Sequence, residues 1–386
     1  MNQAVVESIA KTYGTPFYYY EEEVILKQIQ KVKQVLGDLS NHLTYALKAN
    51  SNPEILTMIQ REGLGMEVAT PGEMRLAMKS GTNPSEVIWN SNGKPPETIH
   101  YFCEQSVGAV NIDSLEELDL WGFYLSGHPL VKIPRLFLRI NPDIDPKTHP
   151  YLSTGLLSSK FGVQEHLIPL SLKKAKDLHL SLAGLHAHIG SQILDTSPLQ
   201  TTYARMFALS RFYGFSEVNL GGGWGIPYQS QSLDLTEISK TIQHDGTGLT
   251  ISLELGRFIV GEAGTYVARV IGTKWSGSRH FVVLDGGMNH LIRPALYGAV
   301  HPYEFFGNIT ECKADFDIVG PLCESGDILV KNTSGYLPEV GSLVAINLAG
   351  AYGYSMASHY NGTGRPAEIL IDSKGTFREI RAREIA

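Results

Sequence analysis

Lys48 is the residue whose position most clearly suggests chemistry. It lies near the end of the apolar run at residues 43–49, where polar and turn residues begin. A lysine amine in a desolvated pocket loses its proton readily and can form a Schiff base with a carbonyl compound. The alternative is an ordinary lysine that extends from a strand end into water. This segment leaves both interpretations open, so other motifs must decide between them.

Three consecutive glycines suggest a place where an anion could be held. Gly221, Gly222 and Gly223 follow the apolar run at residues 218–220. Without side chains they let backbone N–H groups approach an anion closely, and a helix beginning behind them would add partial positive charge. The spacing matches neither the dinucleotide fingerprint nor the Walker A loop, which argues against a nucleotide. The motif therefore favours a phosphate site, with a simple tight turn as the alternative.

Glu254 and Arg257 end another short apolar run, at residues 251–257. Taken alone they favour an ion pair. Beside a phosphate site and a strand-end lysine, Glu254 could instead hold a pyridine nitrogen protonated, and Arg257 could bind a phosphate or carboxylate bidentately. His188 could stack on an aromatic cofactor, although a core histidine is the alternative for both His186 and His188. These two share a strand face, and we prefer His188 because it lies nearer the strand end.

The elements that must position these residues form a repeating pattern. Short β-type runs alternate with amphipathic segments such as 71–80, 115–125 and 199–213, several of which carry acids in their first turn. There are eight runs, at residues 43–49, 65–70, 86–92, 108–114, 136–142, 182–191, 217–225 and 251–257. Eight such units predict a closed parallel α/β barrel, whose functional residues lie at the C-terminal ends of the strands.

After about residue 262 the pattern changes to strands joined by turns. These strands are predicted at residues 265–273, 281–285, 315–319, 327–330, 343–348 and 368–371. They indicate a second, mostly β domain. Its loop at residues 320–327 contains a thiol, two acids and a hydroxyl, and loops of this kind on a rigid scaffold are often functional. A turn with a buried cysteine is the alternative.

Bulk properties exclude several classes of partner. The chain has 386 residues, and 32 Lys and Arg against 39 Asp and Glu leave a net charge of −7, mixed along the sequence. Such a surface disfavours nucleic acid and anionic membranes. No apolar stretch approaches the roughly 20 residues of a membrane span, and the first residues lack signal-peptide character, so we expect a cytoplasmic protein. Cys103, Cys312 and Cys323 lack metal-ligand spacing, so we expect neither disulfides nor a metal site.

The motifs together resemble those of the fold-type III pyridoxal-phosphate decarboxylases, and within them the diaminopimelate decarboxylase family. The similarity runs nearly end to end, through 14–19, 45–50, 90–94, 153–156, 160–162, 188–193, 221–225, 254–257, 285–289, 292–297, 323–327 and 351–361. It implies an alanine-racemase-like (β/α)8 TIM barrel at residues 22–260 that binds the cofactor. It also implies a β domain built from residues 1–21 and 261–386, in which the first 20 or so residues contribute a strand.

The resemblance also implies a role for each matching residue. Lys48 would form the Schiff base with pyridoxal 5'-phosphate, His188 would stack on its ring, and Glu254 would contact its pyridine nitrogen. Other cofactor contacts would come from Ser191, Gly221, Gly222, Gly223, Gly256, Arg257 and Tyr352. Substrate contacts would come from Arg257, Arg293, Tyr297, Glu324 and Tyr352. Cys323 would be the proton donor, and Cys323 and Glu324 would reach into the partner's site in a homodimer with shared active sites.

The activity implied is decarboxylation of meso-2,6-diaminopimelate at its D-centre to L-lysine and CO2, the last step of lysine biosynthesis. Arg293 suits the second carboxylate of that substrate, and Glu324 its distal ammonium. One position departs from the family pattern, because Glu67 stands where relatives commonly have Asp. The alternatives are a decarboxylase of ornithine, lysine, arginine or a carboxylated polyamine, an amino-acid racemase, and a non-catalytic homologue that binds the cofactor.

Overall fold

A computed structural model of the chain describes residues 3–39, 41–149, 152–156 and 159–385. Within it the chain divides into two compact units. The barrel unit contains residues 28–227 and 231–258, and the β unit contains residues 1–27, 228–230 and 259–386. Each unit is described by itself below.

The barrel unit is a closed ring of eight parallel strands, as the alternating pattern predicts. The strands are β2 (Asn41–Ala46), β3 (Gly65–Val68), β4 (Val87–Asn90), β5 (Ala109–Ile112), β6 (Arg135–Asn141), β8 (Leu182–His186), β9 (Glu217–Asn219) and β10 (Thr250–Leu255). They are ordered β5-β4-β3-β2-β10-β9-β8-β6, and pairing of β5 with β6 closes the ring. A short strand, β7 (Val163–Gln164), pairs with Ile140 and Asn141 at the C-terminal end of β6. The predicted barrel is confirmed.

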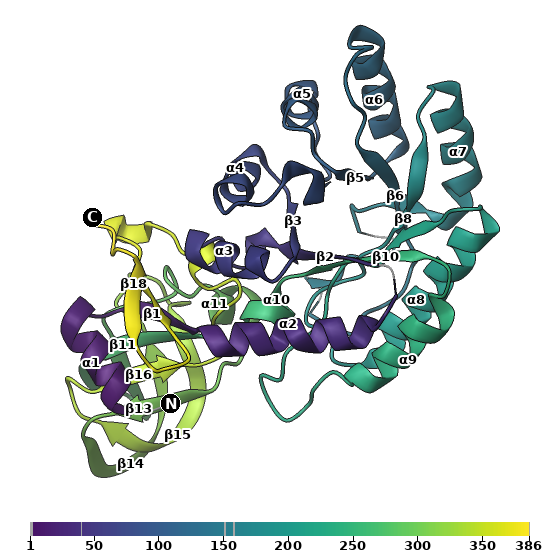
Figure 1. Cartoon of the computed structure of the whole chain (residues 1–386). Helices are drawn as coiled ribbons and strands as arrows, with labels where there is room; N and C mark the ends of the chain where they lie inside the picture. The colour runs from purple at the N-terminus through teal and green to yellow at the C-terminus, as the bar shows by residue number, and fades with distance from the viewer. Residues whose placement is uncertain (1–2, 40, 150–151, 157–158, 386) are drawn as a thin grey trace. The chain divides into compact units, whose positions relative to one another are not determined.

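Helices cover the outside of the ring of strands (Figure 1). They are α2 (Glu22–Leu36), α3 (Pro53–Arg61), α4 (Pro71–Lys79), α5 (Pro96–Glu104), α6 (Leu115–Gly127), α7 (Ile168–Asp177), α8 (Thr196–Phe212) and α9 (Leu235–Asp245). Their starts follow from local chemistry: the Thr70 hydroxyl accepts the N–H of Glu73, and the Glu73 carboxylate accepts the N–H of Ala69. This reciprocal capping begins α4 at the predicted place.

Each of the eight predicted barrel strands runs past the observed strand end, by as many as six residues at β9, where residues 217–225 were predicted. β2 ends at Ala46, and Lys48 lies in the 3-10 turn η1 (Leu47–Ala49) that follows it. β8 ends at His186, so His188 lies in the loop beyond it. The apolar pattern continues past the last paired residue because the turn itself is packed: Leu47 is fully buried and Ala49 is 1% exposed. Both residues therefore lie just beyond the strand ends, at the barrel mouth.

The β unit is built on one long sheet. Its strands are β1 (Phe17–Glu21), β11 (Gly264–Ser276), β12 (Arg279–Leu284), β13 (Tyr303–Phe306), β14 (Ile309–Val319), β15 (Ile328–Pro338), β16 (Leu343–Ile346), β17 (Ala367–Ile371) and β18 (Phe377–Arg381). β1 pairs with β11 antiparallel and with β17 in parallel, so the first residues of the chain do contribute a strand. The sequence pattern missed β13 and β18, which are short or carry alternating charges.

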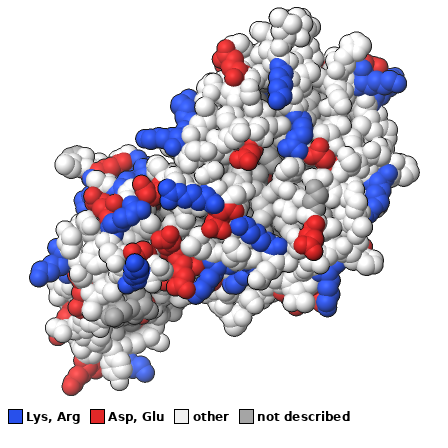
Figure 2. Space-filling model, in the orientation of Figure 1, with Lys and Arg blue, Asp and Glu red and all other residues white. Residues whose placement is uncertain are grey.

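One face of this sheet is packed by α1 (Gln3–Tyr13), whose Val6 and Ile9 are fully buried with Phe17 of β1. The unit also has two short helices, α10 (Arg257–Val260), which starts in the barrel unit, and α11 (Arg293–Tyr297). Among the described residues, no helix is long and apolar enough to cross a membrane. Basic and acidic side chains are interspersed on the face shown in Figure 2, as their mixing along the sequence predicts.

Candidate active site

Lys48 and Glu67 form an ion pair at the barrel mouth. The Lys48 Nζ lies 2.9 Å and 2.8 Å from the two carboxylate oxygens of Glu67. The Lys48 side chain is 44% exposed, whereas that of Glu67 is 1% exposed. Burial raises the pKa of Glu67, Lys48 lowers it, Glu254 raises it again, and the result is a pKa of about 7. The Lys48 amine thus lies against a buried carboxyl group whose pKa is raised to near neutrality.

Glu254 lies at the centre of the barrel, held by side chains from four other strands. Its Oε1 accepts hydrogen bonds from the amides of Asn111 (2.8 Å) and Asn219 (2.7 Å), and its Oε2 accepts one from Asn90 (3.2 Å). His186 Nε2 is 3.4 Å from Oε2. Burial alone would raise the pKa of Glu254, but His186, Lys48 and the Asn111 amide outweigh it and hold the pKa well below its ordinary value. The carboxylate is ionised at any physiological pH.

The sequence pattern missed the three asparagines and the role of His186. Each looks like an ordinary polar residue of a strand until the strands are aligned. In the sheet register Asn90 lies opposite Asn111, and His186 lies opposite Asn219. A signal was present in the sequence, because polar residues on buried strands of a barrel must find partners in its interior.

His188 is a neutral imidazole whose tautomer is fixed by one hydrogen bond. Its Nδ1 accepts the backbone N–H of Gly222 at 3.0 Å, so the ring proton must be on Nε2. Burial, together with the charges of Arg139 and Lys48, lowers the pKa of His188 well below its ordinary value. Both observations require the uncharged ring, which suits an imidazole that stacks on another aromatic ring. The structure therefore separates the two histidines: His186 faces Glu254, and His188 faces the glycine loop.

The glycine loop is shaped by close backbone packing. A Cβ on Gly222 would lie 2.1 Å from the carbonyl oxygen of Glu254, and one on Gly221 would lie 2.4 Å from that of Ala187. The N–H of Gly221 is bonded to the Asn219 side chain at 2.9 Å, and that of Gly222 to His188. These two N–H groups already have protein acceptors. Glycine is needed at positions 221 and 222 because a side chain would collide with these carbonyl oxygens.

Arg257 and Ser191 supply charged and hydroxyl donors in the same unit. The Arg257 Nη2 donates to the Ser191 hydroxyl at 3.1 Å, and Arg257 is only 4% exposed. Gly256, which precedes it, packs against the turn that carries Lys48: a Cβ there would lie 2.9 Å from that of Ala49. A buried guanidinium beside a hydroxyl is well suited to a phosphate.

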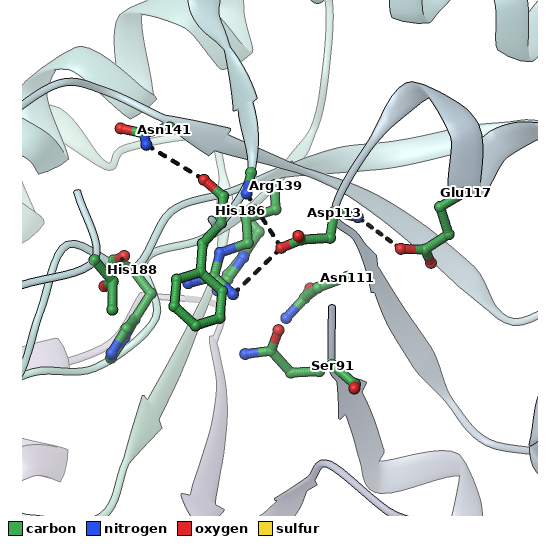
Figure 3. Close-up of polar contacts among 12 residues, drawn as sticks. Ser91, Asn111, Asp113, Glu117, Arg139, Asn141, His186 and His188 are labelled. Atoms are coloured by element: carbon green, nitrogen blue, oxygen red, sulfur yellow. Dashed lines mark hydrogen bonds and ion pairs between the residues drawn. The ribbon is translucent and has the colours of Figure 1, made fainter. Parts of the chain in front are cut away.

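Behind Glu254, a buried ion pair fixes the end of β5. Lys94 has no exposed side-chain surface and donates to the Glu117 carboxylate (2.9 Å) and to the carbonyl of Asn111 (2.7 Å). Glu117 also accepts the N–H of Asp113 at 2.9 Å. Figure 3 shows this contact and the ion pair between Asp113 and Arg139, whose atoms are 3.5 Å apart. The Lys94–Glu117 pair thus holds Asn111, whose side chain donates to Glu254.

In the β unit, Cys323 and Glu324 are exposed at the tip of a loop whose base is rigid. The Glu324 carboxylate accepts a hydrogen bond from the Tyr360 hydroxyl. The base is held by Asp327, a buried residue that accepts the N–H groups of Met288 (2.6 Å) and Leu322 (2.8 Å). The loop therefore presents a thiol and a carboxylate outward from a fixed support.

The remaining predicted residues also lie in the β unit. Arg293 is 2% exposed and begins α11, and Tyr297 ends that helix half-buried. Tyr352 has a φ of +57°, a left-handed conformation that is costly for a bulky residue and that is found most often at functional sites.

The barrel unit fits pyridoxal phosphate by the chemistry of its donors. The cofactor has an aldehyde, a pyridine nitrogen, an aromatic face and a phosphate. The barrel offers an amine (Lys48), an ionised carboxylate (Glu254), a neutral imidazole (His188) and a guanidinium with a hydroxyl (Arg257 and Ser191), all placed beyond or within strand ends of one ring. This is the mouth where barrels of this architecture place their functional groups.

Comparison with known proteins places the chain in the class that this fold and site define. The family model for the pyridoxal-binding domain of pyridoxal-dependent decarboxylases matches residues 22–261. The chain is thus a pyridoxal-phosphate-dependent decarboxylase of the barrel type. Within that class it belongs to the diaminopimelate decarboxylase family.

Relatives of that family match over almost the whole chain. The diaminopimelate decarboxylase of Aquifex aeolicus is 35% identical over 390 residues, which cover 98% of this chain and 91% of the relative. That of Campylobacter jejuni is 34% identical and covers 98% and 96%. Among solved structures, the Helicobacter pylori enzyme in complex with L-lysine superposes with a TM-score of 0.92 at 33% identity, covering 98% of this chain and 97% of that one.

Proposed function

We propose that this chain decarboxylates meso-2,6-diaminopimelate at its D-centre and releases L-lysine and CO2. The observation that carries the proposal is the arrangement at the barrel centre, where the Lys48–Glu67 pair lies in the same ring as an ionised Glu254 held by three amides. The full-length similarity to diaminopimelate decarboxylases supports the choice of substrate.

When bound, pyridoxal phosphate supplies an aldehyde carbon that condenses with amines and a ring that takes up the electron pair left when CO2 departs. The residues of the chain prepare that chemistry. Lys48 would anchor the cofactor through its amine, and Glu67 would take up the proton that this amine must lose. Glu254 would keep a proton on the pyridine nitrogen, because its carboxylate remains charged. The neutral His188 would pack against the ring and exclude water there.

We propose that Arg257, Ser191 and the loop Gly221 to Gly223 surround the phosphate, with Tyr352 contributing from the β unit. Gly221 and Gly222 would shape the floor of this site, because their N–H groups are bonded within the protein. Gly256, which has no side chain, would let Arg257 approach the phosphate. Residues 22–260 would form the cofactor-binding domain, with residues 1–21 and 261–386 as the second domain.

For the substrate, we propose contacts with Arg257, Arg293, Tyr297, Glu324 and Tyr352. Diaminopimelate carries a second amino-carboxylate that ornithine and lysine lack. The buried guanidinium of Arg293 suits that carboxylate, and Glu324 suits the ammonium beside it.

We further propose a homodimer in which Cys323 and Glu324 enter the site of the partner subunit, where Cys323 returns a proton to the carbon that has lost CO2. Their exposure at the tip of a supported loop suits this role. A mixture of Lys48→Ala and Cys323→Ala subunits tests it: if sites are shared, random exchange restores up to about a quarter of wild-type activity. No recovery after demonstrated exchange would contradict shared sites.

The activity itself is tested by incubating purified protein with pyridoxal phosphate and meso-diaminopimelate and measuring lysine and CO2. A parallel panel of ornithine, lysine and arginine, scored by CO2 release, tests the related decarboxylases. Chiral chromatography without CO2 release would reveal a racemase. Absence of lysine at every enzyme concentration would overturn the proposal.

A further inference from the structure

Arg293 is braced by two side chains that no part of the reaction described above uses. Its Nη1 lies 2.7 Å from the hydroxyl of Tyr228 and 2.9 Å from Nε2 of His301. Arg293 and His301 are each 2% exposed. All three residues belong to the β unit, although Tyr228 is distant in sequence from the rest of it.

These contacts determine the protonation of His301. A guanidinium has only donors, so the Nε2 of His301 must accept and cannot carry a proton. The Nδ1 of His301 lies 2.9 Å from the backbone carbonyl of Asn347, which can only accept, so Nδ1 must carry the proton. The two contacts demand the same neutral tautomer. A protonated His301 would direct an N–H at the guanidinium.

The support behind His301 is itself fixed. Asn347 follows β16, its N–H donates to the carbonyl of Pro302 at 2.8 Å, and its side chain accepts from the Thr265 hydroxyl at 3.1 Å. His301 therefore connects the guanidinium to the sheet of the β unit through a chain of hydrogen bonds.

Tyr228 fixes the plane of the same guanidinium. The Arg293 Cζ lies 4.9 Å from the centroid of the Tyr228 ring, and the edge of that ring meets His301 with centroids 5.1 Å apart. A ring contact together with two acceptors on one nitrogen restricts both the tilt and the rotation of the guanidinium. Both acceptors are neutral, so these two bonds orient the positive charge without cancelling it.

We propose that His301, with Tyr228, is a positioning residue for substrate specificity. It holds Arg293 in the orientation that binds the carboxylate retained in the product, and so selects substrates that carry a second amino-carboxylate. This inference rests on the proposed function. Its predicted effect is confined to ligands with that carboxylate, which L-lysine keeps and cadaverine lacks.

The test compares holoenzymes carrying His301→Leu, His301→Gln and Tyr228→Phe. Loss of an acceptor to a charged donor should raise KM for diaminopimelate and the inhibition constant of L-lysine by about 10-fold or more in His301→Leu, with a smaller change in kcat. Gln offers an oxygen near the position of Nε2 and should restore both to within about threefold of wild type. Tyr228→Phe, which keeps the ring, should raise both less than His301→Leu. Inhibition by cadaverine should not change in any variant.

His280→Leu is the matched control, since it removes another buried histidine of the β unit, and it should leave both constants unchanged. Wild-type KM and lysine inhibition in His301→Leu would overturn the positioning role, as would an equal weakening of lysine and cadaverine. Failure of the wild-type enzyme to form lysine would instead overturn the proposed function, so the two failures are distinguishable.

Discussion

The centre of the barrel and the tip of the loop at residues 320–327 differ in how their functional groups are held. Glu254 receives hydrogen bonds from three strands and is fully enclosed within one unit. Cys323 and Glu324 lie exposed on a loop whose base is fixed by Asp327, and Glu324 accepts one hydrogen bond, from Tyr360. The barrel centre is enclosed by its own strands, whereas the loop tip presents a thiol and a carboxylate at the surface. The two regions should therefore respond differently to mutation.

The largest effect is expected from Lys48→Ala, which removes the amine at the barrel mouth. We expect kcat to fall by about 1000-fold or more, because no neighbouring group can replace a covalent anchor. Absorbance of the bound cofactor near the visible edge should disappear. The fold should persist, since the Lys48 side chain is 44% exposed. Lys27→Ala, in the exposed pair with Glu23 of α2, is the control and should behave as wild type.

Lys94→Met tests whether the barrel centre owes its order to the buried ion pair. It leaves the Glu117 carboxylate buried without its cation, which usually costs about 3–5 kcal/mol. Urea denaturation followed by circular dichroism should show this loss. Lys27→Met, which breaks an exposed pair, should change stability by no more than about 0.5 kcal/mol. Equal stability of Lys94→Met and wild type would show that β5 does not depend on the pair.

Cys323→Ala should distinguish the loop from the barrel centre, because it should lower activity without changing cofactor binding. We expect kcat to fall by about 100-fold, the usual contribution of a positioned proton donor. The affinity for pyridoxal phosphate, measured by fluorescence quenching of the cofactor-free protein, should remain that of wild type because the barrel centre is complete without the loop. Weaker cofactor binding in this variant would show that the loop contributes to the cofactor site of the barrel.

The smallest effect concerns Glu67 and pH. Its pKa rises from the ordinary 4.5 to about 7 on folding, chiefly through burial. The folded state thus binds this proton more tightly than the unfolded state, so the stabilisation is fully present below pH 4.5 and is lost as the pH rises through about 7. Between pH 5 and 8, the thermal midpoint of cofactor-free wild type should fall by a few degrees relative to Glu67→Gln. If the thermal midpoints of the two proteins changed equally with pH, the raised pKa of Glu67 would be contradicted.

Much of the fold could be predicted from local patterns. Apolar runs of strand length, alternating with amphipathic segments, indicated eight βα units, and acids such as Glu73 in first turns indicated where helices begin. Strand ends were less predictable. Leu47 and Ala49 are buried by packing of the turn and not by strand pairing, so the apolar pattern overran β2 by three residues.

The candidate site was predictable only in part. Lys48, Glu254 and Arg257 stand out in the sequence because charged residues at the ends of apolar runs are unusual. Asn90, Asn111 and Asn219 do not, because a polar residue on a buried strand indicates an interior partner without indicating which one. Their role arises from strand register, which brings residues up to 164 positions from Glu254 into contact with it.

The sequence by itself determined the kinds of groups available: an amine, buried acids, a glycine turn and a thiol loop, set on two domains whose hydrophobic periods differ. Only the tertiary structure decided which groups meet. It directed His186 toward Glu254 and His188 toward Gly222, paired Lys48 with Glu67, and assigned a single tautomer to His301 between Arg293 and Asn347. The physical reason is that protonation and orientation depend on distances of a few ångströms between segments far apart in the chain, and those distances are set by packing.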